Sequence, residues 1–182
     1  MYNPQSTNDS GLASPVNASG NPSGLSNLTF CWNPVQGGEE CFTDETAWAA
    51  GTKYVARGNW ATYTSYSGVE KTVTLFAGKT YVAGTVNFSV PVAGEVTITI
   101  TLNPGFRFAL NPILGEEDTF DNNVKVQDYA TPPPAVNPAP GLFAWKKVAL
   151  SSPTTIQVPV NNYYGVHVDV ERQIPCSETE PE

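Results

Sequence analysis

The stretch Gly94-Glu-Val-Thr-Ile-Thr-Ile-Thr-Leu-Asn-Pro104 decides the fold class of this chain. Its branched aliphatic residues alternate with hydroxyl residues: Val96, Ile98, Ile100 and Leu102 with Thr97, Thr99 and Thr101. Successive side chains of an extended strand point to opposite faces of a sheet. The pattern therefore predicts a strand of an antiparallel sheet, with the aliphatic face in the core and the threonine face in water.

The rest of the chain repeats this pattern in short segments that are separated by glycine and proline turns. We expect strands at 28–32, 39–43, 60–66, 69–76, 79–90, 105–110, 123–129, 142–145, 154–160 and 164–172. Gly84 marks a bulge or bend in one strand, and Asp44–Ala50 reads as one helical turn between the N-cap Asp44 and the stop Gly51. The sequence thus predicts an all-β chain, an antiparallel β-sandwich or jelly-roll-like single domain.

Composition divides the 182 residues into three parts. Residues 1–24 are rich in Asn, Ser, Gly and Pro and predict an extended arm or linker, residues 25–176 the β-sandwich domain, and 177–182 an acidic tail. The arm is too polar to fold on its own, so we expect it to lie against a neighbouring copy. Leu12 and Val16 are the residues we expect to anchor it there.

Charge limits the classes of partner. The net charge is -8, and no basic patch is present to neutralise phosphates, so we expect no nucleic acid partner. No apolar run is long enough to span a bilayer, so we expect no membrane span. Charged residues make up only 14% of the chain, below the roughly 25% of an average domain. Together with many hydroxyl and amide side chains, this favours a secreted, extracellular or cell-surface protein.

Three cysteines allow one disulfide, and its partners stay open. Cys31 and Cys41 flank the turn-forming segment 33–38, and a hairpin there would bring them together. The alternatives are a Cys31–Cys176 or a Cys41–Cys176 bridge, and each leaves one thiol over.

The loop from 111 to 122 is acidic. Glu116, Glu117, Asp118 and Asp121 supply carboxylates at short spacing, as Ca²⁺ sites require, but they do not follow the EF-hand alternation. We expect a solvated loop and no cofactor, with Ca²⁺ binding as the alternative.

His167 is the one histidine and the natural candidate for a catalytic base. It lies between Val166 and Val168, so it shares a strand face with Asp169 and Glu171. Strand alternation places that face in solvent. No Gly-x-Ser-x-Gly turn is present, and we expect no enzymatic activity.

Aromatic residues are frequent, at 11% of the chain. Most large aromatic side chains in proteins are buried, so we expect Trp32, Trp48, Trp60 and Trp145 to serve mainly in the core. The alternative is a platform on which sugar rings stack, as in a carbohydrate-binding module.

Four segments carry a resemblance: Gly24-Leu-Ser-Asn-Leu-Thr-Phe-Cys31, Glu45-Thr-Ala-Trp-Ala-Ala-Gly51, Arg57-Gly-Asn-Trp-Ala-Thr-Tyr63 and Tyr163-Tyr-Gly-Val-His-Val168. They resemble segments of uncharacterised secreted microbial surface proteins with β-sandwich folds, over residues 24–176. The resemblance implies an extracellular location and assigns no catalytic residue.

These observations favour a non-catalytic extracellular structural protein, a subunit of a filament or surface assembly that is joined through its N-terminal arm and sheet edges. We expect the assembly to be a homo-oligomer or homopolymer. A carbohydrate-binding module is the first alternative and a small secreted hydrolase the second.

Overall fold

The computed structural model describes residues 40–113 and 119–176. The strands are β1 (Cys41–Ala49), β2 (Thr52–Lys53), β3 (Thr62–Ser65), β4 (Lys71–Ala77), β5 (Tyr81–Phe88), β6 (Glu95–Leu102), β7 (Phe106–Phe108), β8 (Val124–Tyr129), β9 (Trp145–Lys147), β10 (Thr154–Pro159) and β11 (Tyr163–Ile174). Among these residues the one helix is the 3₁₀ turn η1 (Pro140–Leu142). The predicted all-β fold is confirmed.

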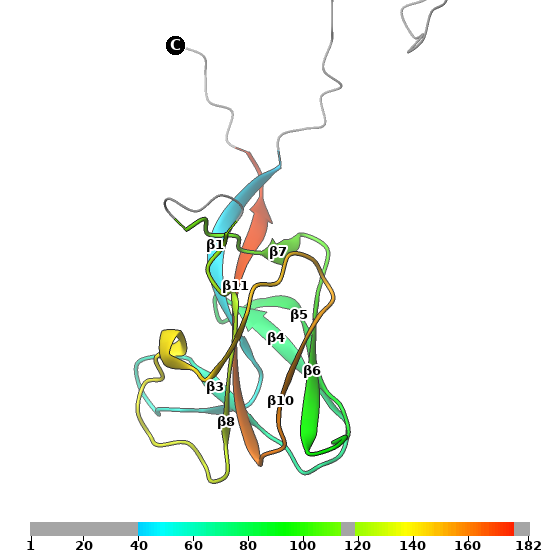
Figure 1. Cartoon of the computed structure of the whole chain (residues 1–182). Helices are drawn as coiled ribbons and strands as arrows, with labels where there is room; N and C mark the ends of the chain where they lie inside the picture. The colour runs from blue at the N-terminus through cyan, green and yellow to red at the C-terminus, as the bar shows by residue number, and fades with distance from the viewer. Residues whose placement is uncertain (1–39, 114–118, 177–182) are drawn as a thin grey trace, which may run out of the picture. The chain divides into compact units, whose positions relative to one another are not determined.

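All paired strands run antiparallel, in the order β10-β6-β5-β4-β1-β11-β3-β2 (Figure 1). The twelve-residue strand β11 is the centre of the arrangement. One of its edges pairs with β1 and β3, and the other pairs with β7 and β8. Strand β9 continues the sheet beyond β8.

The inward side chains of β6 and β11, two strands that are not neighbours in this order, pack in one hydrophobic core. Val96, Ile98, Ile100 and Leu102 of β6 lie in the same buried cluster as Val166, Val168 and Val170 of β11. The aliphatic residues of β6 are at most 9% exposed, and its threonines are half-buried or exposed, as the alternation predicts. The arrangement is compatible with the predicted sandwich.

Gly84 marks the irregularity predicted in β5. The pairing of β4 with β5 shifts register between Leu75 and Phe76, so that Ala83 is an extra residue on β5. A Cβ at Gly84 would lie 2.0 Å from the carbonyl oxygen of Thr101 on β6. Only glycine permits this close approach of two backbones.

The helical turn predicted at Asp44–Ala50 is wrong. All of these residues except Ala50 belong to β1, which pairs with β11 from Cys41 to Trp48 and with β4 from Ala47 to Ala49. Ala47 and Ala49 point into the core, and Trp48 lies between them on the opposite face. Pairing on two edges outweighs the weak local preference of a capped alanine-rich segment.

The Cys31–Cys41 bridge that the hairpin argument favoured is also wrong, because Cys41 is bonded to Cys176. The register of β1 with β11 explains this pairing, since Cys41 lies opposite Ile174. The start of β1 and the end of β11 accordingly lie side by side at one end of the molecule (Figure 1). The bridge joins residues 135 positions apart. Cys31 lies outside the described residues.

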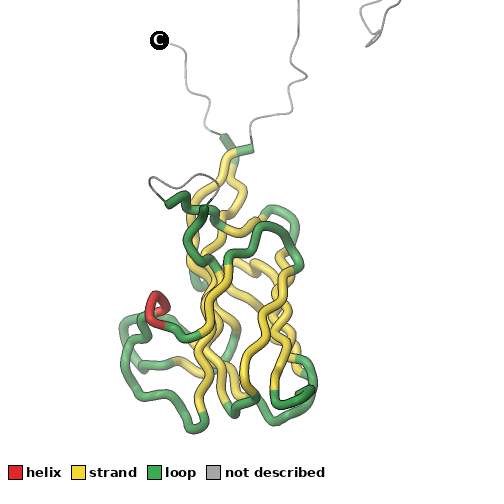
Figure 2. The backbone as a smooth tube through the Cα atoms, viewed as in Figure 1, coloured by secondary structure: helices red, strands yellow, loops and turns green. Residues whose placement is uncertain are grey.

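The proline-rich segment between β8 and β9 contains no strand (Figure 2), because proline has no amide hydrogen to give to a sheet. The segment includes η1, so the strand expected at 142–145 begins only at Trp145. No helix within residues 40–113 and 119–176 is long and apolar enough to cross a membrane. The arm residues Leu12 and Val16 lie outside the described part, as do Trp32 and the tail 177–182.

Candidate functional site

A row of five side chains crosses the outer face of the sheet, away from the core. Strand pairing places Trp48 of β1 opposite both Phe76 of β4 and His167 of β11. His167 in turn faces Lys125 of β8, which faces Lys146 of β9. Side chains at such paired positions are neighbours on one face. The row therefore runs from aromatic residues at one end to lysines at the other.

An aromatic layer covers the middle of this row. Trp48, Tyr54, Ala61 and Phe143 form a second buried cluster, separate from the core. The Trp48 ring packs edge-on against Tyr54, Phe143 and His167, with ring centres 6.0, 6.1 and 4.9 Å apart.

The layer also presses on β11 at Gly165. A Cβ there would lie 2.1 Å from the Tyr54 hydroxyl oxygen. Glycine at this position is what lets the layer approach the strand. Both faces of β11 are therefore covered at Gly165 and His167.

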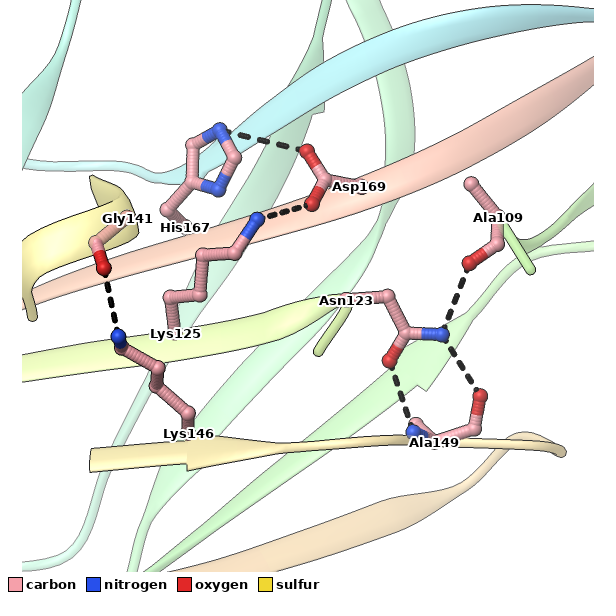
Figure 3. Close-up of polar contacts among 8 residues, drawn as sticks. All are labelled: Ala109, Asn123, Lys125, Gly141, Lys146, Ala149, His167 and Asp169. Atoms are coloured by element: carbon pink, nitrogen blue, oxygen red, sulfur yellow. Dashed lines mark hydrogen bonds and ion pairs between the residues drawn. The ribbon is translucent and has the colours of Figure 1, made fainter. Parts of the chain in front are cut away.

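His167 lies under this layer, so its predicted place on a solvated strand face is wrong. The residue is only 6% exposed. Burial lowers the pKa of its imidazole from 6.5 to about 4; Asp169 opposes this shift, and Lys125 adds to it. Its Nδ1 has no hydrogen-bond partner, and its Nε2 lies 3.7 Å from Asp169 Oδ1 (Figure 3). His167 is therefore neutral at physiological pH.

Asp169 and Lys125 form an ion pair beside the histidine. Lys125 Nζ lies 2.5 Å from Asp169 Oδ2 (Figure 3). Both line a polar pocket of about 260 Å³, which Asp121 and Lys146 also border. Lys146 donates to the carbonyl oxygen of Gly141 in η1, two residues before Phe143 of the aromatic layer. The pocket thus holds two ammonium groups as well as two carboxylates.

The buried side-chain amide of Asn123 lies next to this polar region. Asn123, at the start of β8, donates through Nδ2 to the carbonyl oxygens of Ala109 and Ala149 and accepts from the Ala149 amide (Figure 3). These bonds join the chain before β8 to the chain after β9. Asn123 is therefore a structural residue that holds the polar pocket in place.

Of the four predicted calcium ligands, only Asp121 lies in the described residues. Glu116, Glu117 and Asp118 lie outside the described residues, and Asp121 is exposed. The described residues contain no cluster of three or more His, Cys, Asp or Glu side chains placed to hold a metal ion. Calcium binding by this loop stays a prediction.

The geometry around His167 offers no hydroxyl or thiol nucleophile. Neither imidazole nitrogen contacts a Ser, Thr or Cys side chain in any hydrogen bond of the described part of the chain. A general base must lie within hydrogen-bond reach of the group it deprotonates. The absence of enzymatic activity stays a prediction from sequence.

The other end of the row opens into an aromatic groove of about 310 Å³, lined by Trp48, Trp60, Phe76, Thr62, Lys53 and Lys79. Hydrogen bonds from the threonines of β3 fix its floor: Thr62 Oγ1 donates to Ala49 and Thr64 Oγ1 to Ala50, at 2.7 and 2.9 Å. Trp48 is buried, as expected of most tryptophans, but in the outer aromatic cluster and not in the main core. Trp60 is only partly buried. Lys53 and Lys79 belong to no sequence motif that predicts a binding site.

Comparison with known proteins adds no family. A scan against family models, a search of curated proteins and a search of solved structures each found no match to this chain. The function has to be argued from the geometry.

Proposed function

We propose that this protein is a non-catalytic structural subunit of an extracellular homopolymer, in which a segment of one copy adds to the sheet edge of the next. The observation that carries this proposal is the edge of β10 that no strand of the described part pairs with. The opposite edge of β10 pairs with β6. A free strand edge accepts another strand through main-chain hydrogen bonds.

The orientation of the backbone identifies which groups of β10 face outward. The Thr155 carbonyl oxygen accepts from Lys147 Nζ, 2.7 Å away on β9, so it faces away from β6. Because main-chain groups alternate along an antiparallel strand, those of Gln157 also face outward. Apart from the pairing of β10 with β6, no main-chain hydrogen bond between described residues uses the Gln157 amide or carbonyl, whereas the Pro159 carbonyl accepts from the Tyr164 hydroxyl. Gln157 is therefore the position at which an added strand would pair.

A groove of mixed character lies beside the first residue of β10. Its volume is about 390 Å³, and its lining combines five apolar residues, Leu102, Phe106, Phe108, Leu110 and Leu150, with Arg107, Ser151, Ser152 and Glu171. Leu150 is 68% exposed. Leu110, also exposed, lies on the same groove, and exposed apolar side chains that adjoin one another favour contact with another chain.

The N-terminal sequence has the composition of a suitable occupant. Leu12 and Val16 are apolar residues in a polar segment, four positions apart. In an extended strand such residues share one face. Two apolar side chains on one face suit a groove beside a strand edge, and main-chain bonds supply the rest of the attachment.

The disulfide supports the extracellular part of the proposal. Bridges such as Cys41–Cys176 persist mainly in oxidising compartments. The low fraction of charged residues points the same way.

Substitution of Gln157 tests the proposal. Gln157→Pro removes the outward amide and leaves the bonds to β6, whereas the matched Gln157→Ala keeps the amide. We expect the wild type and Gln157→Ala to form filaments in electron micrographs and Gln157→Pro to stay monomeric, with circular dichroism showing all three folded. A wild-type chain that is monomeric at high concentration, or a folded Gln157→Pro that assembles normally, would overturn the proposal.

A second test concerns the arm. Deleting residues 1–24 should leave a folded protein that no longer assembles, as light scattering would measure. Assembly of the truncated protein into the same filaments would show that the arm is not the occupant of the groove.

A further inference from the structure

The aromatic groove combines three rings with two lysines. Phe76 and Trp48 are cross-strand neighbours, and Trp60 lies partly exposed beside them. The volume of about 310 Å³ is at the lower limit of small-molecule sites, which span roughly 300–1,000 Å³. The groove therefore has room for a small ring-shaped group.

The two lysines are unusual among the cations of this chain. All nine lysines and arginines lie in the described part. Six of them contact an acidic side chain or a main-chain oxygen: Lys71, Arg107, Lys125, Lys146, Lys147 and Arg172.

The other three cations, Lys53, Arg57 and Lys79, have no hydrogen bond or ion pair to a described residue. Two of these three border the aromatic groove, and no acidic residue lines it. The nearby carboxylate of Glu45 pairs with Arg172. In a protein of net charge -8, the groove is thus a local site of positive charge, with two lysines and no carboxylate among its lining residues.

The backbone at Lys79 supports a functional role. Gly78 and Lys79 form the turn between β4 and β5 with φ angles of 52° and 75°. The left-handed conformation costs a residue with a Cβ on the order of 1 kcal/mol. Asparagine or glycine would avoid most of that cost, yet a lysine occupies the position and lines the groove.

The walls of the groove are fixed before any ligand arrives. The bonds from Thr62 and Thr64 tie β3 to the end of β1. Gly51 packs so closely on β3 that a Cβ there would lie 2.0 Å from the Tyr63 carbonyl oxygen. A preformed site loses little conformational entropy when it binds.

We propose that the aromatic groove binds an acidic sugar unit, a uronate residue of a polysaccharide, with its ring against Trp60 and its carboxylate between Lys53 and Lys79. The C–H groups of a sugar face carry partial positive charge, which suits the negative face of an aromatic ring. The carboxylate carries the charge opposite to that of the two ammonium groups. This site is independent of the edge of β10 and of assembly.

The test is binding of a galacturonic acid oligomer to the full chain by titration calorimetry, with a neutral galactose oligomer as comparison. We expect the wild type to bind the acidic oligomer, more weakly as salt rises, and to bind the neutral one at least about tenfold more weakly, since two exposed ion pairs are lost. Equal affinity for both oligomers, or no binding of the acidic one, would overturn the proposal.

Variants locate the site. The double variant Lys53→Gln/Lys79→Asn removes both charges, and asparagine accepts the left-handed backbone; we expect about a tenfold loss of affinity. Arg57→Gln removes the third unpaired cation, which does not line the groove, and should change affinity less than twofold. If the double variant keeps wild-type affinity, the groove is not the site.

Trp60→Ala separates stacking from charge. We expect it to weaken binding of the acidic oligomer at least about tenfold, because the ring's contact with the sugar face is lost. The melting temperature is measured alongside. If this variant does not fold, the exposed lysine substitutions decide the matter alone. Unchanged affinity in a folded Trp60→Ala protein would overturn the stacking arrangement.

Discussion

Strands β6 and β11 both supply aliphatic side chains to the same core, but their outer faces differ. The outer face of β6 carries threonines that are half-buried or exposed. The outer face of β11 carries Gly165 and His167, both buried beneath Tyr54, Phe143 and Trp48. The two strands show the same alternation in sequence and end in different surroundings.

The outer faces of β6 and β11 show what alternation in a sequence establishes and what it does not. Alternation tells which residues of a strand share a face, because that depends only on the strand's own geometry. It does not tell whether a second layer covers the outer face, because that layer comes from elsewhere in the chain. Here it comes from residues 54–63 and 140–143.

Substitutions on the two faces of β6 should differ most in their effect on the free energy of unfolding. Ile100→Asp places an unpaired charge in the core, where Ile100 is 0% exposed. We expect a loss of about 4 kcal/mol or more, enough to unfold many domains. Thr101→Asp, on the exposed face, should change stability by less than about 0.5 kcal/mol. Urea titration of both variants measures the difference, and a normally stable Ile100→Asp protein would refute the register.

The pH dependence of stability tests whether water is excluded from the outer face of β11 at His167. His167 has a pKa of about 4 when folded and 6.5 as its ordinary value. Between these values His167 binds more protons in the unfolded chain than in the folded one, so its contribution to the stability falls as the pH drops from about 6.5 to 4. The shift corresponds to about 3 kcal/mol.

His167→Gln is the control, because it keeps a polar side chain but does not titrate at these pH values. We expect the difference in unfolding free energy between the wild type and this variant to shrink as the pH falls. A difference that is constant from about pH 7 to pH 4 would mean that His167 is hydrated, like the threonines of β6.

Particular residues show how far the sequence predicts this molecule. The strand β6 and the bulge at Gly84 are local patterns, and each is confirmed. The strand at Asp44–Ala50 and the Cys41–Cys176 bridge depend on the pairing of β1 with β11, which joins residues far apart in sequence. No local pattern reports such a register.

The candidate sites are predicted less well for the same reason. His167 reads as a solvated residue because Asp169 and Glu171 follow it in the alternation, and its cover comes from other segments. Lys53 and Lys79 come from β2 and from the turn after β4, and meet only in the folded chain. One signal was available: a lysine directly after a glycine between two strand patterns predicts a turn that presents its side chain.

A smaller effect is expected at the contact between β11 and its cover. Gly165→Ala would place a Cβ 2.1 Å from the Tyr54 hydroxyl oxygen, and we expect a loss of about 2 kcal/mol from the crowding. Gly141→Ala is the matched control, because nothing lies within 4 Å of its Cβ position. The combination Gly165→Ala/Tyr54→Phe should recover part of the loss, since the nearest ring atom is then 3.3 Å away. Equal stability of the two alanine variants in urea titrations would contradict the packing.

The smallest effect is spectroscopic and compares the two faces of β11 directly. Burial raises the pKa of Tyr164, on the inner face, to about 12. Burial, together with the hydrogen bond to the Tyr129 hydroxyl, also raises the pKa of Tyr54, on the outer face. If both faces are dry, neither phenol ionises near its ordinary pKa of 10.0. Tyr54→Phe should therefore leave the phenolate absorbance of the folded protein unchanged up to about pH 11. In denaturant the same variant should lose the contribution of one of the eight tyrosines, because every phenol is then hydrated. A loss of that size already in the folded protein would show that water reaches Tyr54, and the outer face of β11 would then resemble that of β6.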